Sequence, residues 1–332
     1  MEGQTWGVPV AEGGGLFDRL ERLAVRGPVG PGWLNVFLLG VRAARRFVDV
    51  RVTGLAAEMT YYALISLLPL ITALGAALGF LQRFVGQQQV QQIETAFVGV
   101  LSRVFDEELA GDILAPMVEG LLRQERAGVA IGSLAIALWL AGRMFRAAIR
   151  ALDDAYVVSE RRGLLALLGL GTGLSLLAVV TVLVVLAMVV VGPLLGGGQR
   201  LADWMGLGRA FEVLWAVTRW PVVAVICVVF LSVLYRYGPN VRNTWRDCLP
   251  GAVVGTAGLV AVAIGFQVYL SVAGPTVPEV AEGGEAVAVA GRMLGAVLAG
   301  VLWGWLSSIV VLTGGILNAE VRRLRRDALT GT

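Results

Sequence analysis

The sequence contains no histidine, and only 15% of its residues are charged. Histidine is the commonest general acid or base and a common metal ligand, so its absence removes the usual parts of most hydrolase mechanisms. A soluble domain usually has about 25% charged residues, so the low charged fraction argues against a soluble globular protein. We therefore expect a protein that is not an enzyme and that has no cofactor and no metal site.

Three further features are missing. The two cysteines are Cys227, in an apolar run, and Cys248, beyond a polar turn, so we expect no disulfide between them. The first 30 residues contain no apolar run of the kind that a cleavable signal peptide needs. No phosphate-binding Gly-Lys-Ser/Thr loop is present, which argues against direct use of ATP. Membrane insertion is therefore expected to depend on the first membrane-spanning helix.

Long apolar runs dominate the chain, and hydrophobic residues make up 57% of it. A helix needs about 20 apolar residues to cross a hydrocarbon core of about 30 Å. Runs of that length are predicted at 55–81, from 129 into the charged stretch 143–154, and at 163–196, 211–235, 249–273 and 293–317. The fold class is therefore all-α, a polytopic membrane protein with six transmembrane helices.

The segments around these spans divide the rest of the chain. Residues 1–32 are predicted to be a flexible N-terminal segment, 55–318 the six-helix membrane domain, and 319–332 a basic cytoplasmic tail. Residues 82–128, within the membrane domain, have two amphipathic patterns that predict a helical hairpin outside the bilayer.

Residues 33–54 predict an amphipathic helix that lies on the membrane surface. Its apolar residues at helical spacing are Leu34, Phe37, Leu38, Val41, Ala44 and Val48. Its arginines, Arg42, Arg45, Arg46 and Arg51, are expected to face anionic headgroups, where they anchor the topology or form a specific lipid site.

The placement of arginine predicts the orientation of the spans. Arginines cluster before the first span and after the second, fourth and sixth, whereas the intervening connections carry acidic residues. Cytoplasmic loops near span ends are enriched in basic residues. Both termini are therefore predicted to be cytoplasmic and the hairpin extracytoplasmic.

A few ionisable residues lie within the predicted spans, where charge is costly. Glu58 shares one side of the first span with Tyr61 and Tyr62, and Pro69 follows in the same span. The end of the second span carries a charged stripe made of Arg143, Arg146, Arg150, Asp153 and Asp154. The stripe could supply a buried ion-pair partner for Glu58, or it could be a solvated extension of the helix. Glu58 itself is either a structural ion-pair partner or a functional acid.

Two further polar groups stand at span ends. The connection before the fifth span contains Asn240, Trp245, Arg246 and Asp247, and we expect Trp245 to anchor it at the interface. Asp247 or Cys248 is expected at the helix cap, with Pro250 in the first turn. Asn318 and Glu320 end the sixth span, where caps and hydrogen bonds to neighbouring helices explain them.

Glycines four residues apart recur within the predicted spans. The pairs are Gly75 and Gly79, Gly169 and Gly173, Gly251 and Gly255, and Gly300 and Gly304. This spacing lets helix backbones approach closely, either within the bundle or across the seam of a homo-oligomer.

These residues, taken in order, resemble the YihY/BrkB family of bacterial inner-membrane proteins, formerly named ribonuclease BN. The matching segments are 56–69, 143–156, 160–162, 235–240, 245–247, 249–251, 269–271 and 315–320. The sequence departs from the family at Glu58, where alanine is frequent, and around 282–285, where an acidic loop replaces a Tyr-Gly stretch. The resemblance implies six spans and a location in the bacterial cytoplasmic membrane.

Two functions from different classes agree with these features. Polar residues within long apolar spans favour a transporter or translocase for a lipid or other amphiphilic solute. Its energy would come from a gradient, with Glu58 as a candidate proton carrier, or from a partner protein. A membrane scaffold that binds envelope partners is the alternative. A ribonuclease is disfavoured, because the chain lacks histidine and a basic surface interleaved with aromatics, so no nucleic-acid partner is expected. The expected partners are membrane lipids and an unidentified lipid or solute.

Overall fold

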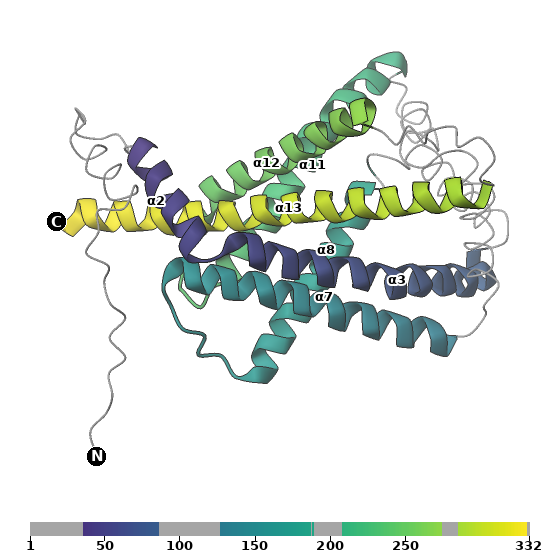
Figure 1. The fold of residues 1–332 in the computed structure, drawn as a ribbon, viewed down its shortest axis with the longest axis horizontal. Coiled ribbons are helices and arrows are strands. Elements are labelled where there is room, and N and C mark those ends of the chain that lie inside the picture. The colour runs from purple at the N-terminus through teal and green to yellow at the C-terminus, as the bar shows by residue number, and fades with distance from the viewer. Residues whose placement is uncertain (1–35, 86–126, 187, 189–207, 274–284, 331–332) are drawn as a thin grey trace.

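The computed structural model describes residues 36–85, 127–186, 188, 208–273 and 285–330. Within these ranges the chain is helical and contains no strand. The helices are α2 (Val36–Asp49), α3 (Val52–Val85), α7 (Ala127–Tyr156), α8 (Leu164–Leu186), α11 (Gly208–Tyr237), α12 (Trp245–Ala273) and α13 (Glu285–Thr330) (Figure 1). The predicted all-α fold is confirmed.

Six of the described helices are long and apolar enough to cross a membrane, as predicted. The candidate spans are Val52–Ala73, Ile131–Tyr156, Leu164–Leu186, Val217–Tyr237, Trp245–Tyr269 and Val297–Arg326. Most of the predicted hairpin, the predicted N-terminal segment and the end of the predicted third span lie outside the described residues. The predicted tail, 319–332, continues α13 as a helix as far as Thr330.

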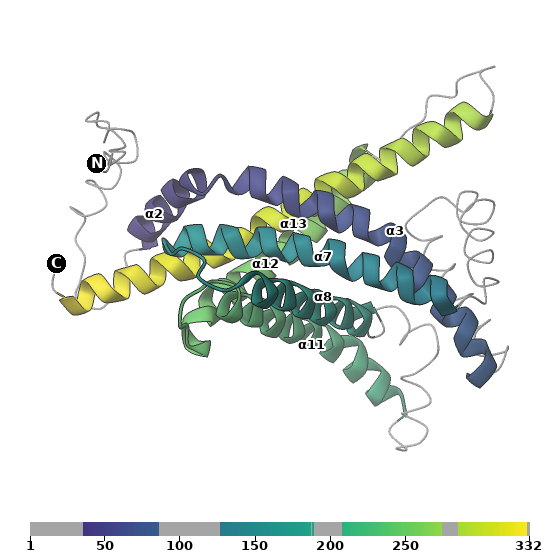
Figure 2. The ribbon, with the colours of Figure 1, turned by 90° about the horizontal axis from the view of Figure 1, so that it is seen from below.

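The six long helices form a closed ring. Each packs against its neighbour in the order α3, α7, α8, α11, α12 and α13, and α13 packs back against α3. Helix α13 also contacts α7, so the ring has no open centre at this crossing. Figures 1 and 2 show the helices converging at one end of the bundle and diverging toward the other. We call the first end, where α7 and α11 finish and α3 and α12 begin, the basic end, and the other the distal end.

Two hydrophobic clusters form the core, and α7 belongs to both. The first joins α3, α7 and α13 through residues that include Met59, Ala148 and Ile316. The second joins α7, α8, α11 and α12 around Leu152 and the fully buried Tyr235. Helix α7 is therefore the central helix, and near the basic end most of its residues are buried or half-buried.

Helix α2 packs against α13 and turns sharply into α3. Arg51, between the two helices, has a φ of 56°, a left-handed conformation that commonly ends a helix. The predicted surface helix, 33–54, thus ends at Asp49, and its last residues belong to α3. Leu39 is buried, whereas Phe37 and Val48 are exposed. Val41, which belongs to the predicted apolar face, is buried as well. Only part of that face is therefore available to the membrane, while a second face docks on the bundle.

The start of α12 differs from the prediction. The helix begins at Trp245, and Thr244 precedes it as the cap. Asp247 occupies the third helical position, where its carboxylate accepts hydrogen bonds from the Thr244 backbone N–H (3.2 Å) and hydroxyl (2.6 Å). The predicted cap at Asp247 or Cys248 is wrong, and Pro250 lies in the second turn. Threonine and aspartate are both common helix caps, so the local sequence did not identify the true start.

Pro250 disturbs the backbone hydrogen bonding of α12, and a side chain of α13 bonds the neighbouring backbone groups. Proline has no N–H and disturbs the hydrogen bonds of the preceding turn. The side chain of Asn318 accepts a hydrogen bond from the Gly251 N–H (2.7 Å) and donates one to the carbonyl of Cys248 (3.0 Å). A buried amide from a neighbouring helix thus satisfies groups that the proline disturbs.

Glycines permit the close approach of α12 and α13. A Cβ atom at Gly251 would lie 2.0 Å from the carbonyl oxygen of Gly314 and 2.6 Å from the Asn318 side chain. Gly255 faces Leu231 and Tyr235 of α11, and Gly304 faces Thr60 of α3. These glycines therefore serve packing within the bundle.

Candidate functional site: a charged seam between α3 and α7

Of the residues in the predicted charged stripe, Arg150 is the one that pairs with Glu58. The Arg150 guanidinium donates a hydrogen bond of 2.5 Å to a carboxylate oxygen of Glu58, linking α7 to α3. The side chains are 51% and 36% exposed, so the pair lies on the outer surface of the bundle and not in its core. The prediction of an ion pair across the first two spans agrees with this contact, whereas the prediction that the pair is buried is wrong. It is exposed because α7 directs its buried faces toward α13 and α8.

Arg143 lies on the same surface, two helical turns further from the basic end. Its guanidinium stands 4.7 Å from the centre of the Tyr62 ring and 5.5 Å from the centre of the Trp139 ring. Tyr61 is exposed and packs edge-to-face on Tyr62, with ring centres 5.3 Å apart. The arginine therefore occupies an aromatic cage, and cations over aromatic faces are stabilised by about 0.5–2 kcal/mol.

Arg143 lies well inside a candidate membrane span. It lies near the middle of the span Ile131–Tyr156, about 18 Å from the first residue of that span at 1.5 Å per residue. Arg143 is nevertheless exposed. An arginine at the centre of a membrane helix costs about 2.5–3.5 kcal/mol on insertion scales, and such residues usually mark a functional path.

We define the seam as Glu58, Tyr61 and Tyr62 of α3 with Trp139, Arg143 and Arg150 of α7. Arg143 and Arg150 are seven residues apart and share one face of α7. The site residues predicted from the sequence included every one of these except Trp139. Its position four residues before a mid-span arginine was the signal that could have identified it, because residues four apart are neighbours on a helix.

The rest of the predicted charged stripe does not belong to the seam. Arg146 turns toward α8, where its side chain approaches Gly171. Asp153 is buried, and one of its oxygens accepts a 2.6 Å hydrogen bond from the backbone N–H of Asn240. Asp154 is exposed, one turn beyond Arg150. Residues three apart differ by about 60° around a helix, which separates Arg146 and Asp153 from the face of Arg143 and Arg150. Pro69 lies within α3, nearer the distal end.

The connection between α11 and α12 is a structural element. Asn240 also donates a hydrogen bond from its side chain to the carbonyl of Ser159 (3.3 Å), and Arg162 donates to the carbonyls of Gly238 and Pro239, both at 2.9 Å. These bonds tie it to the connection between α7 and α8.

The first turn of α12 carries three more of the predicted residues. Trp245 packs edge-to-face against Tyr237 and lies under Arg236, whose guanidinium is 4.7 Å from its ring centre. Arg246 is exposed, and Asp247 pairs with Arg325 of α13 at 3.2 Å. The structure therefore does not bring this connection into the seam.

Glu320 lies in a separate place, between α13 and α2. Its side chain is 3% exposed and forms ion pairs with Arg46 (3.8 Å) and Arg323 (3.3 Å). Arg46 was predicted to face lipid headgroups, but it reaches a carboxylate more than 270 residues away in the sequence. No local pattern of residues can reveal such a pair.

One protein-family model matches almost the whole helical bundle. The model of the virulence factor BrkB family matches residues 43–331, which include all six candidate spans of the described residues and the second half of α2. The chain belongs to the BrkB family. The resemblance found in the sequence is thereby confirmed, and the family and the six apolar helices together identify a multi-pass membrane protein.

One curated relative of this BrkB-family chain is the ribonuclease-like protein YfkH of Bacillus subtilis (strain 168). The two are 26% identical over 272 residues, which cover 82% of this chain and 90% of the relative. No solved structure matches the chain.

Proposed function

We propose that this protein is a translocase for a phospholipid or similar amphiphile, and that the polar headgroup moves along the seam between α3 and α7. The observation that carries the proposal is Arg143, an exposed arginine near the middle of a membrane span and inside an aromatic cage. A cation held at that depth lowers the cost of bringing a phosphate to the same depth.

The seam offers each part of a phospholipid a suitable partner. Arginine binds phosphate through bidentate hydrogen bonds, and the Tyr62 and Trp139 rings can contact a quaternary amine. The Glu58–Arg150 pair adds opposite charges between Arg143 and the basic end. Beyond the seam, the surfaces of α3 and α7 expose Leu68, Ile131 and Ile136, against which acyl chains can lie. Headgroup and chains would thus stay in separate environments during the crossing.

Orientation and coupling belong to the same proposal. The basic end, with its arginine clusters, is cytoplasmic, and the membrane is the bacterial inner membrane. Glu58, because it is partly exposed, can exchange a proton with water or headgroups, which makes it the candidate for coupling to a proton gradient. Arg150 is its ion-pair partner between such events.

The decisive experiment measures movement of fluorescently labelled phosphatidylcholine and phosphatidylglycerol across proteoliposomes. Wild type is compared with Arg143→Gln, and Arg219→Gln is the matched control. Arg219 is also an arginine over an aromatic ring in a membrane span, 5.4 Å from the centre of Trp220, but it lies on α11. Folding is verified for each variant by thermal unfolding in detergent.

We expect Arg143→Gln to slow movement about tenfold, the effect of losing about 1.4 kcal/mol of headgroup stabilisation. Arg219→Gln should stay within about twofold of wild type, a difference of less than about 0.5 kcal/mol. Equal slowing of lipid movement in both variants would show that the headgroup does not move along the seam. Absence of movement by folded wild-type protein, with either lipid, would overturn the translocase and favour the scaffold.

Glu58→Gln in the same vesicles separates the two roles of this residue. If Glu58 carries a proton, the variant loses the response to an imposed pH gradient while its melting temperature stays close to that of wild type. The small stability effect is expected because exposed ion pairs contribute only about 0–1 kcal/mol. A response that survives the substitution would leave Glu58 as an ion-pair partner alone.

The proposal includes no ribonuclease activity. The relative YfkH is named ribonuclease-like, but the present sequence has no histidine and the seam lies within membrane-spanning helices. RNA cleavage by purified protein, abolished by a point substitution and unaffected by further purification, would contradict this part.

A further inference from the structure

A second charged feature lies at the basic end, apart from the seam. A cavity of about 580 Å³ opens between α2 and α13, two helices that pack together although they stand at opposite ends of the sequence. Binding sites for small molecules usually measure about 300–1,000 Å³. The cavity is therefore large enough for more than a simple ion.

The lining of this cavity is strongly basic. Its arginines are Arg42, Arg45, Arg46, Arg323 and Arg326. The two carboxylates in the lining are Asp49 and Glu320, so the formal charge is an excess of three positive charges. Several guanidinium groups around one concave site favour a ligand with phosphate oxygens, which arginine binds in bidentate geometry.

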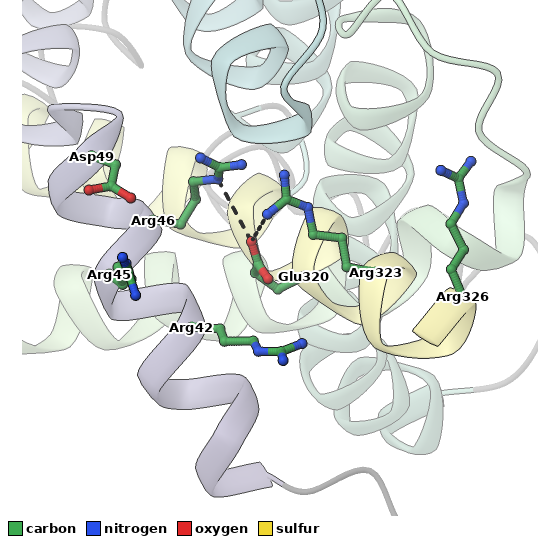
Figure 3. A pocket seen from close by; sticks show the side chains of 7 residues that line it. All are labelled: Arg42, Arg45, Arg46, Asp49, Glu320, Arg323 and Arg326. Carbon is green, nitrogen blue, oxygen red and sulfur yellow. Dashed lines mark hydrogen bonds and ion pairs between the residues drawn. The ribbon is translucent and has the colours of Figure 1, made fainter. Parts of the chain in front are cut away.

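Glu320 organises the cavity. It lies on the floor, buried, and its carboxylate holds Arg46 from α2 and Arg323 from its own helix (Figure 3). Glu320 is therefore a positioning residue, because one of its carboxylate oxygens holds two guanidinium groups from different helices close together. Figure 3 shows Arg42 on the other side of Glu320 and Arg326 further along α13.

Arg46 experiences the excess positive charge directly. Burial lowers the pKa of Arg46, and the nearby Arg323 lowers it further, although Glu320 acts in the opposite direction. The Nε atom of Arg46 is also buried without a hydrogen-bond partner. An anion in the cavity would supply a hydrogen-bond acceptor and reduce the repulsion between Arg46 and Arg323.

The position of α2 indicates where the anion comes from. Phe37 and Val48 of this helix are exposed apolar residues, and α3 enters the membrane span directly after it. An amphipathic helix of this kind lies at the level of the lipid headgroups with its apolar residues among the acyl chains. The cavity on its other side therefore lies at headgroup level.

We propose that the cavity between α2 and α13 binds the phosphate-bearing headgroup of an anionic phospholipid. The bound lipid fastens α2 and the end of α13 to each other and to the membrane surface. This site is separate from the seam and does not depend on translocation.

Binding is tested on detergent-purified, delipidated protein with three soluble probes. They are dioctanoyl phosphatidylglycerol, dioctanoyl phosphatidylcholine and glycerol 3-phosphate, and affinity is measured by microscale thermophoresis. We expect phosphatidylglycerol to bind more tightly than either of the others. A basic residue near a membrane surface contributes about 1 kcal/mol, or about fivefold in affinity. Arg42→Gln combined with Arg326→Gln should therefore weaken binding about 25-fold, with Arg46, Arg323 and Glu320 left in place.

The matched control is Arg161→Gln combined with Arg242→Gln. Both residues are exposed at the basic end, in the connections between α7 and α8 and between α11 and α12, and neither lines the cavity. The control should bind phosphatidylglycerol within about twofold of wild type. The single variant Arg45→Gln, at an exposed position, provides a milder test with a loss of about fivefold if the double variant does not fold.

Three results would overturn the proposal. Equal weakening in the control would show that only the overall charge of the basic end matters. Equal affinity for phosphatidylcholine would remove the selectivity for anionic lipid. Glycerol 3-phosphate binding as tightly as phosphatidylglycerol would assign the cavity to a soluble phosphate compound instead of a lipid.

Discussion

The two halves of α12, one near the basic end and one nearer the distal end, are both largely apolar but differ in packing. Near the basic end, Gly251, Ala252, Gly255 and Thr256 are buried against α11 and α13. Nearer the distal end, the described residues 260–269 are mostly exposed, although they are largely apolar. Apolar surface gains little by leaving lipid, so close contact and hydrogen bonds, more than hydrophobicity, decide where membrane helices associate. The basic half therefore fixes the arrangement of the helices.

The sharpest test of this comparison substitutes one glycine from each half of α12. Gly251→Ala should destabilise the protein by about 3 kcal/mol or prevent folding, because the new Cβ would meet the Gly314 carbonyl and the Asn318 side chain. Gly265→Ala should change stability by no more than about 1 kcal/mol, in the stabilising direction, because no heavy atom lies within 4 Å. Thermal and chemical unfolding in detergent measure both. Equal stability of the two variants would mean that the halves do not differ in packing.

A second test compares two amide side chains. Asn318→Leu should cost about 2 kcal/mol, because it leaves the buried Gly251 N–H and Cys248 carbonyl without the Asn318 amide that bonds both. Gln267→Leu, at an exposed position near the distal end of α12, should change the unfolding midpoint very little. A larger loss at Gln267 than at Asn318 would reverse the comparison.

The smallest expected effect concerns one hydroxyl group. Tyr235 of α11 is fully buried and donates a 2.6 Å hydrogen bond to the carbonyl of Val311 on α13. Tyr235→Phe should lower stability by about 0.6 kcal/mol, the average for a polar contact between membrane helices. Tyr269→Phe, at an exposed tyrosine of α12, is the control and should be neutral. Resolving this difference requires repeated unfolding curves, and a neutral Tyr235→Phe would show that shape alone holds α11 against α13.

The fold was predictable because the length and apolar composition of a local segment are enough to identify a membrane span. Length and hydropathy predicted the six helices, and helical spacing offered the charged stripe of the second span as one source of a partner for Glu58. The predicted start of α12 was misplaced, since two common cap residues, Thr244 and Asp247, lie three positions apart. Only the contact between Thr244 and Asp247 identifies the true cap.

The two charged sites were not equally predictable. The seam joins helices that are neighbours in sequence and space, so helical periodicity identified most of its residues and missed only Trp139. Periodicity did not show that Glu58 and Arg150 are exposed, because it shows which residues share a face but not whether another helix covers that face. The cavity between α2 and α13 was not predicted, since its arginines come from the two ends of the chain.

The sequence by itself determined the all-α membrane fold, the six spans and the gathering of arginines at alternate span ends. Those properties depend on the free energy of transferring each segment from water to lipid, and local composition determines that free energy. Only the tertiary structure decided that Arg146 and Asp153 leave the seam, that Asn318 bonds the backbone groups next to Pro250, and that Glu320 holds Arg46. These outcomes depend on which helices touch, and glycines at a few contacts control that approach through sterics and not through hydropathy.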